Sequence, residues 1–149
     1  MQIVTTHTNS DFDALASMVA ASFLYPGIVR VMPAQVQAPV REYLAVHRDL
    51  LQLTPRRSID LDQVHRLVVT DTAHWDRLDD MSMLADRSDL ECIVWDHHMT
   101  QGTIHASELH LEEVGATVTL LLERMQAREC AFPPMHATLF LLGIYDDTG

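Results

Sequence analysis

Residues 3–24 read IVTTHTNSDFDALASMVAASFL, and this stretch decides the fold class. Its first four residues are all β-branched, which predicts a short strand. Residues 14–24 are rich in Ala, Leu and Met, which predicts a helix. The polar residues 7–11 between them predict a loop. The stretch is therefore expected to be a strand, a loop and a helix, with polar side chains at the carboxyl end of the strand.

Two later stretches repeat this pattern. Residues 66–71 and 91–96 are short, mostly apolar runs that end on Asp71 and Asp96, so each predicts a buried strand running into a carboxylate. We also expect strands over residues 28–32 and within 102–111, a turn around Thr54-Pro55, and helices over 40–53, 79–86, 116–128 and 134–145. Apolar strands alternating with helices predict an α/β fold. We expect a three-layer α/β/α arrangement with a mostly parallel sheet of about five strands.

Composition agrees with one compact domain over residues 1–149, since 48% of the residues are hydrophobic. No apolar run approaches the roughly 18 residues of a membrane span, and the N-terminus lacks the basic region of a secretory signal. We therefore expect a soluble cytoplasmic protein with no membrane partner. Cys92 and Cys130 lie far apart, so neither a disulfide framework nor a thiolate zinc site is indicated.

The net charge of −11 argues against a broad nucleic-acid surface, because such a chain repels phosphate backbones. All ten basic residues are Arg, and the chain has no Lys. A receiver-like signalling domain also gathers aspartates at the ends of parallel strands. It would normally need a lysine beside that acidic pocket, so this alternative is disfavoured.

Asp11, Asp71 and Asp96 each follow a predicted strand, so they should meet at one edge of the sheet, where open α/β sheets bind ligands. Asp13 adds a second carboxylate in the loop after the first strand, and hard divalent cations prefer such oxygens. The alternative is that Asp13 or Ser10 only caps the helix. Asp71 and residues 146–149 likewise have the composition of ordinary turns.

His97 and His98 are adjacent, and adjacent side chains of an extended segment point in opposite directions. We therefore expect only one of them to reach a given metal and the other to face the substrate. The remaining histidines, which lack carboxylate neighbours at strand ends, are not expected in a site: His47, His65, His74, His105, His110 and His136.

Together these segments resemble the motifs of the DHH-family phosphoesterases. Residues 7–17 resemble the first motif, Asp71 the second, Asp96-His97-His98 the third, and Asp147-Thr148-Gly149 the fourth, all in order. The family includes manganese-dependent pyrophosphatases, exopolyphosphatases, nano-RNases, cyclic-dinucleotide phosphodiesterases and single-strand exonucleases. The sequence departs from it at Ser10, where Pro is frequent, and at Asp146, where Thr or Ser is usual.

The resemblance implies a two-metal site. One metal would be held by His7, Asp11 and Asp71 and the other by Asp13, His97 and Asp147, with Asp71 bridging them. His98 would face the substrate phosphate, and Asp96 would orient the histidines. Mixed carboxylate and imidazole ligands suit Mn²⁺ best, with Mg²⁺, Co²⁺ or Zn²⁺ as substitutes.

The implied activity is hydrolysis of a phosphoanhydride or phosphodiester by a hydroxide that bridges the metals. The substrate would be polyphosphate, pyrophosphate or a short oligonucleotide. Because family members continue into a second, substrate-binding domain, we expect these 149 residues to be a fragment that binds metal but hydrolyses poorly. The alternative function is a non-catalytic metal- or nucleotide-sensing module of a larger tRNA nucleotidyltransferase-like protein, since the opening motif also resembles DHH modules that precede CBS and nucleotidyltransferase domains.

Overall fold

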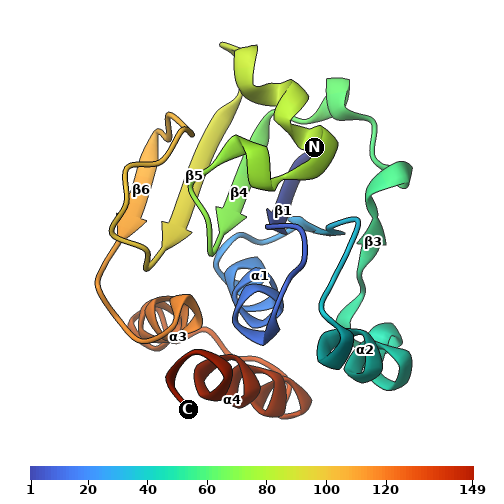
Figure 1. Ribbon diagram of the computed structural model, residues 1–149, viewed down its shortest axis with the longest axis vertical. Helices are drawn as coiled ribbons and strands as arrows, with labels where there is room; N and C mark the ends of the chain where they lie inside the picture. The colour runs from blue at the N-terminus through green and yellow to red at the C-terminus, as the bar shows by residue number, and fades with distance from the viewer.

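The computed structural model describes residues 1–149 and contains one six-stranded, all-parallel sheet of order β3-β2-β1-β4-β5-β6 (Figure 1). The bounds of the strands are β1 (Gln2–Thr6), β2 (Val29–Met32), β3 (Thr54–Pro55), β4 (Arg66–Thr70), β5 (Glu91–Asp96) and β6 (Glu108–Leu111). The predicted α/β class and parallel sheet are confirmed. The sheet has one strand more than expected, because Thr54-Pro55 forms an edge strand on β2 instead of a turn. Proline is tolerated there because an edge strand has backbone groups without a ladder partner.

The register of the sheet aligns the carboxyl ends of its three central strands. Thr6 of β1 pairs with Thr70 of β4, which pairs with Trp95 of β5. The residues that follow, His7, Asp71 and Asp96, therefore lie next to one another at one edge of the sheet. This is the acidic edge that the sequence pattern predicted.

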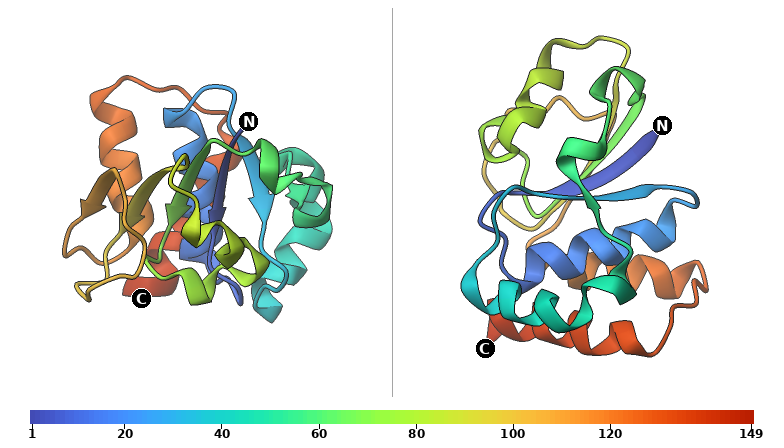
Figure 2. Two further views of the ribbon diagram at one scale, coloured as in Figure 1. Left: turned by 90° about the horizontal axis from the view of Figure 1, so that it is seen from above. Right: turned by 90° about the vertical axis from the view of Figure 1, so that its right-hand side faces the viewer.

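Four α-helices lie on one face of the sheet, and short 3₁₀ helices cover the other (Figure 2). The α-helices are α1 (Phe12–Leu24), α2 (Ala38–Leu51), α3 (Thr117–Ala127) and α4 (Met135–Thr148). The 3₁₀ helices are η1 (Arg56–Ser58), η2 (Leu61–Gln63), η3 (Trp75–Arg77) and η4 (Asp79–Asp86). The helical stretch expected over residues 79–86 is thus a 3₁₀ helix. Leu78, Met81 and Leu84 are buried at a spacing of three residues, which is the period of a 3₁₀ helix.

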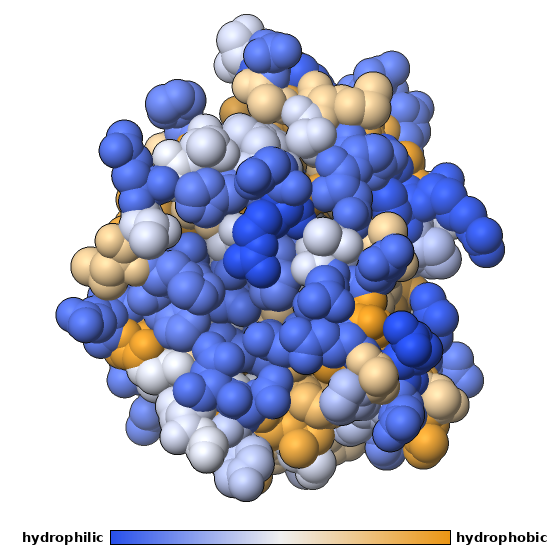
Figure 3. Space-filling view, viewed as in Figure 1, coloured by the Kyte–Doolittle hydropathy of each residue, from blue (hydrophilic) through white to orange (hydrophobic).

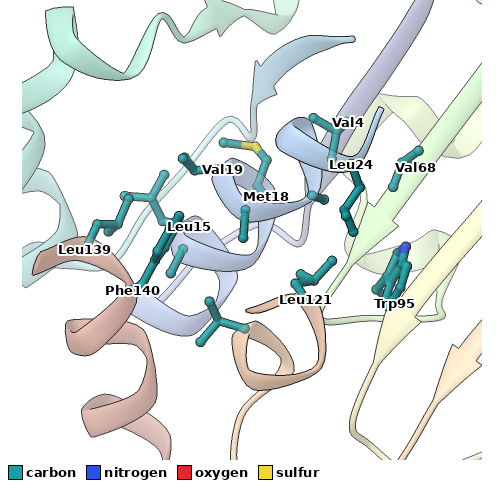
Figure 4. Packing of buried hydrophobic residues seen from close by; sticks show 14 of the residues in the cluster. Val4, Leu15, Met18, Val19, Leu24, Val68, Trp95, Leu121, Leu139 and Phe140 are labelled. Carbon is teal, nitrogen blue, oxygen red and sulfur yellow. The ribbon is translucent and has the colours of Figure 1, made fainter. Parts of the chain in front are cut away.

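The α1 helix forms the centre of the larger apolar core (Figure 4). Residues 13–21 are all buried, because α1 packs against the sheet on one side and against α3 and α4 on the others. Leu15 lies near Leu139 and Phe140 of α4, and Leu121 of α3 lies towards Trp95 of β5. A helix buried on most sides needs small and apolar side chains, which the Ala-rich sequence of α1 supplies; its buried polar residues Asp13 and Ser17 are hydrogen-bonded to each other.

Gly143 sets the close approach of α4 to α1. A Cβ atom at this position would lie 2.7 Å from Cβ of Ala16 and 3.1 Å from the carbonyl oxygen of Phe12. The helix also continues three residues beyond the predicted end at Tyr145, to Thr148. Asp147, one turn after Gly143, is therefore held by a helix and not by a turn. None of the four α-helices combines the length and the apolar character that a membrane crossing requires.

Candidate metal centre

All six side chains predicted as metal ligands come together at the carboxyl edge of the sheet. Their donor atoms form two groups, each within 4.8 Å: His7, Asp11 and Asp71 in one, and Asp13, Asp71, His97 and Asp147 in the other. Asp71 belongs to both. A third group joins Asp71 and His97 to His98. The clustering matches the predicted division into two sites that share one carboxylate, and the ligand roles themselves remain predictions.

Asp71 lies at the centre of the cluster. It directly follows β4, and its backbone lies in the left-handed region, with φ of 62°. Asp tolerates this conformation better than most residues, and such backbone conformations cluster at functional sites. One carboxylate oxygen, Oδ1, accepts a hydrogen bond from Thr117 Oγ1 at 2.8 Å, and Oδ2 lies 3.2 Å from Nε2 of His7. His97 Nε2 lies 3.4 Å from Oδ1. Both oxygens thus face histidine nitrogens from different loops.

Backbone carbonyls hold His7 and His97 in the orientation that a metal ligand needs. His7 Nδ1 lies 2.8 Å from the carbonyl oxygen of Thr8, and His97 Nδ1 lies 2.9 Å from that of Val114. A carbonyl can only accept, so each Nδ1 carries the proton. Each Nε2 is then directed at the carboxylates, where its lone pair is available to a cation.

Asp13 and Asp11 cap different helices. Asp11 is the N-cap of α1 and accepts from the backbone N–H of Ala14 at 2.9 Å. Asp13 is fully buried and accepts from the backbone N–H groups of Thr117 and Val118 at 2.9 Å each, so it satisfies the first turn of α3. The alternative that Asp13 or Ser10 caps the first helix is wrong. Asp13 instead ties α1 to α3 while one edge of its carboxylate faces Asp71 and His97.

Asp96 and His98 form a connected pair beside the cluster. The buried Asp96 Oδ1 accepts from Nδ1 of His98 at 2.7 Å and from the backbone N–H groups of His97 and His98 at 2.8 and 3.2 Å. The expectation that the two histidine rings diverge is wrong. Their centroids lie only 4.3 Å apart, directly after the end of β5, and a ring nitrogen of each lies within 4.8 Å of Asp71.

The last turn of α4 supplies two neighbouring carboxylates with different contacts. Asp147 Oδ2 lies 3.2 Å from His97 Nε2, whereas Asp146 Oδ2 accepts from the backbone N–H of Phe12 at 3.1 Å. Asp146 therefore fastens the end of α4 to the start of α1. Its departure from the family pattern has this structural explanation, and it lies in none of the three ligand groups.

The buried carboxylates and imidazoles of the cluster have shifted pKa values when no cation is bound. Burial, together with the nearby charge of Asp71, raises the pKa of Asp13 to about 9. Burial also raises the pKa of Asp11. For Asp71, the hydrogen bonds from His7 and Thr117 and the close approach of His97 outweigh burial and lower the pKa. The Asp71 carboxylate in turn raises the pKa of His97 to about 9. Carboxylates and imidazoles thus share protons that bound cations would displace.

The donor set fits a divalent cation. His97 Nε2 is buried and makes no hydrogen bond of acceptable geometry, although carboxylate oxygens of Asp147, Asp71 and Asp13 lie 3.2, 3.4 and 3.8 Å away. A buried nitrogen without a partner is rare in native proteins. A cation among these atoms would accept its lone pair and neutralise the carboxylates.

Two residues of the centre escaped the sequence analysis. Thr117 donates to the central carboxylate, and Val114 orients His97 through its carbonyl. Only the position of Thr117 at the start of a predicted helix gave any signal, since its backbone N–H is a donor there. The six histidines excluded from the site lie in none of the ligand groups: His47, His65, His74, His105, His110 and His136.

Comparison with known proteins supports the resemblance. The chain is 34% identical over 151 aligned residues to an A-adding tRNA nucleotidyltransferase of Geobacter sulfurreducens and 28% identical over 148 to one of Aquifex aeolicus. These alignments cover 100% and 99% of this chain but 17% of each relative, so the chain spans about a sixth of their length.

The fold is that of an exopolyphosphatase-related protein from Bacteroides fragilis, with a TM-score of 0.77 at 17% identity, over 99% of this chain and 46% of the other. The model of the DHH family, N-terminal domain, matches residues 2–144. That match covers nearly the whole chain and includes five of the six clustered ligand candidates. This chain therefore belongs to the DHH family, as an N-terminal domain of that family.

Proposed function

We propose that this domain is a two-metal phosphoesterase that hydrolyses a phosphoanhydride or phosphodiester bond. The observation that carries the proposal is the sharing of Asp71 between two groups of ligand atoms, each with one histidine and at least one further carboxylate. The shared carboxylate of Asp71 would hold two cations close together. Two such ions would supply an activated water and positive charge for the phosphate oxygens. Oxygen-rich, mixed ligation favours Mn²⁺, with Mg²⁺, Co²⁺ or Zn²⁺ as substitutes.

The protein's own side chains prepare the site for this chemistry. The carbonyls of Thr8 and Val114 fix the Nδ1 protons of His7 and His97, so neither ring has to rotate on binding a cation. Thr117 holds the central carboxylate by a hydrogen bond to Oδ1. Such preorganisation places positive charge where the phosphate charge develops and limits reorganisation during reaction.

His98 is the residue best placed to contact the substrate. Its side chain is 47% exposed, yet its Nδ1 is bound to the buried carboxylate of Asp96. Asp96 accepts a hydrogen bond from Nδ1 of His98 and thereby fixes the orientation of the ring, so that Nε2 is the nitrogen left for the substrate. When it carries a proton, Nε2 can donate to a phosphate oxygen or to the departing oxygen. We assign Asp96 as a positioning residue and His98 as a catalytic residue.

Turnover with Mn²⁺ tests this proposal. The substrates are bis-p-nitrophenyl phosphate, pyrophosphate, polyphosphate, a cyclic dinucleotide and a short oligoribonucleotide, assayed with this chain and with any longer chain that contains it. We expect at least one to be hydrolysed and Asp71→Asn to abolish that activity. Asp62→Asn, an exposed acid in η2, is the control and should leave the rate unchanged. Metal-dependent turnover that survives Asp71→Asn contradicts the proposal.

A second candidate is favoured by the two relatives, whose names assign a different reaction to proteins about six times longer. In that case the domain binds metal or nucleotide without hydrolysis and acts as a sensing module of a tRNA nucleotidyltransferase-like protein. The same panel separates the two. Tight, Asp71-dependent binding with no turnover of any substrate favours the sensing module.

A further inference from the structure

A groove lined by arginines lies at the carboxyl ends of β2 and β3. It consists of two adjoining hollows of about 510 and 610 Å³ that share Met32, Pro33, Ala34 and Arg48. The first runs between the loop after β2 and helix α2, and the second continues towards β3 and η1. Arg41 lines the first hollow, and Arg56 and Arg57 line the second. We call these two hollows the arginine groove.

The groove is the exception in an acidic protein. Four of the ten arginines line it, whereas the chain as a whole has a net charge of −11. Three carboxylates also line it. Asp80 pairs with Arg56 at 2.9 Å, and Asp79 accepts from the backbone N–H of Ala34 at 2.9 Å, which leaves Asp49.

Arg48 and Arg57 are the arginines available to a ligand. Both are exposed, and neither side chain takes part in a hydrogen bond or an ion pair. Nε of Arg56 is buried without a hydrogen-bond partner. Guanidinium groups bind phosphate oxygens in bidentate fashion, so unpaired arginines in a groove indicate a phosphorylated ligand.

The groove is connected to the metal centre through the backbone. Ser10, which lies between the ligand candidates His7 and Asp11, bridges to Val36 on the wall of the groove. Its carbonyl oxygen accepts from the N–H of Gln37 at 2.9 Å. Both sites also lie at the carboxyl edge of the same parallel sheet. The loop at residues 33–37 therefore lines the groove and is also bonded to the loop that carries His7 and Asp11.

The apolar lining selects between classes of phosphorylated ligand. Met32, Pro33, Val36 and Leu44 lie between the arginines. Nucleosides gain from contact with apolar side chains, whereas inorganic polyphosphate does not. The face drawn in Figure 3 is mainly hydrophilic, with apolar side chains in small separate groups.

We infer that the arginine groove binds the backbone and bases of a short single-stranded oligonucleotide whose reacting phosphate lies at the metal centre. The inference rests on the proposed function for the place of that phosphate. It is compatible with the net charge of −11, because the nucleic-acid contact is confined to one groove and is not a broad surface.

The test is binding of a fluorescein-labelled phosphorothioate pentanucleotide, which resists hydrolysis, measured by fluorescence anisotropy with Mn²⁺ present. Two phosphate contacts are expected for Arg48 and Arg57. The double variant Arg48→Ala/Arg57→Ala should therefore bind about five- to tenfold more weakly and reduce the slope of log K against log salt by about 1.4. The control Arg124→Ala/Arg128→Ala removes the same charge from exposed positions at the end of α3 and should bind within twofold of the wild type.

Equal affinity of the groove variant and the wild type, or an equal loss in the control, overturns the inference. Inorganic polyphosphate of the same charge serves as competitor. If it binds as tightly as the oligonucleotide and depends equally on the two arginines, the assignment to an oligonucleotide is wrong. Arginine-dependent binding without hydrolysis of the unmodified oligonucleotide supports the groove and contradicts only the proposed phosphoesterase activity.

Discussion

Among changes in the metal centre, Asp147→Asn is expected to weaken Mn²⁺ binding with the smallest effect on the stability of the metal-free protein. Asp147 lies in the last turn of α4 and its side chain is 22% exposed. A carboxylate there opposes the helix dipole by about 0.3–1 kcal/mol. Its charge also helps to raise the pKa values of Asp11 and Asp13, so it disfavours their ionisation. The side chain of Asp147 makes one ion pair, with His97. The pKa of His97 is raised mainly by Asp71 and not by Asp147. In the metal-free protein, the variant should therefore unfold within about 1 kcal/mol of the wild type.

With Mn²⁺ the two proteins should differ. A ligand present at 100 times its Kd stabilises the native state by about 2.7 kcal/mol. For a chain of this length each kcal/mol raises Tm by about 2–4 °C, so the wild type should gain about 5–11 °C. Loss of one carboxylate ligand should weaken binding at least tenfold, which reduces the gain to about 1.4 kcal/mol, or about 3–6 °C.

The assay is thermal unfolding followed by circular dichroism, with EDTA and with increasing Mn²⁺. Asp146→Asn is the matched control, because it removes the same charge from the adjacent residue and its amide oxygen can still accept from Phe12. The control should keep the full response to Mn²⁺. An unchanged response in Asp147→Asn, or an equal loss in both variants, would refute the assignment of Asp147 as a ligand.

Three further predictions follow from single side chains. Gly143→Ala should lower the stability of the metal-free protein by about 1–3 kcal/mol, because the new methyl group would meet Ala16. It should also weaken the stabilisation by Mn²⁺, because α4 would shift and displace Asp147. Helix propensity alone predicts a more stable variant, and that result would contradict the prediction. Burial lowers the pKa of His136 in the folded protein below its value in the unfolded chain. The stability that the neutral ring contributes is therefore present above about pH 6.5 and is lost as the pH falls through the pKa of the folded state. His136→Phe should therefore lose less stability than the wild type between pH 7.5 and 5.5 in unfolding titrations, and parallel losses would count against it. His98→Ala should reduce kcat at least about 100-fold with unchanged Mn²⁺ affinity, and weaker Mn²⁺ binding in calorimetry would instead make His98 a ligand.

The sheet and the carboxyl-edge site could be predicted because the signals are local. Each central strand is an apolar run that ends on His7, Asp71 or Asp96, and parallel strands bring their carboxyl ends together. The clustering of Asp13 with Asp147, 134 residues apart, followed from resemblance to a family and not from local pattern.

Features decided by tertiary contacts could not be predicted. β3 is two residues long and exists only because β2 offers a free edge. The 3₁₀ helix at residues 79–86 has a three-residue apolar spacing that resembles a helix in a short window. The arginines of the groove are spread over residues 41–57, and their proximity to the metal loop depends on the bridge between Ser10 and Val36.

The central claim is that Asp71 is shared by two cations. Anomalous diffraction from a crystal soaked in Mn²⁺ tests it most directly. The account predicts two anomalous peaks about 3.5–4 Å apart, one beside His7 and Asp11, the other beside Asp13, His97 and Asp147, with Asp71 in contact with both. A single peak at saturating Mn²⁺, or two peaks that Asp71 does not join, would contradict it.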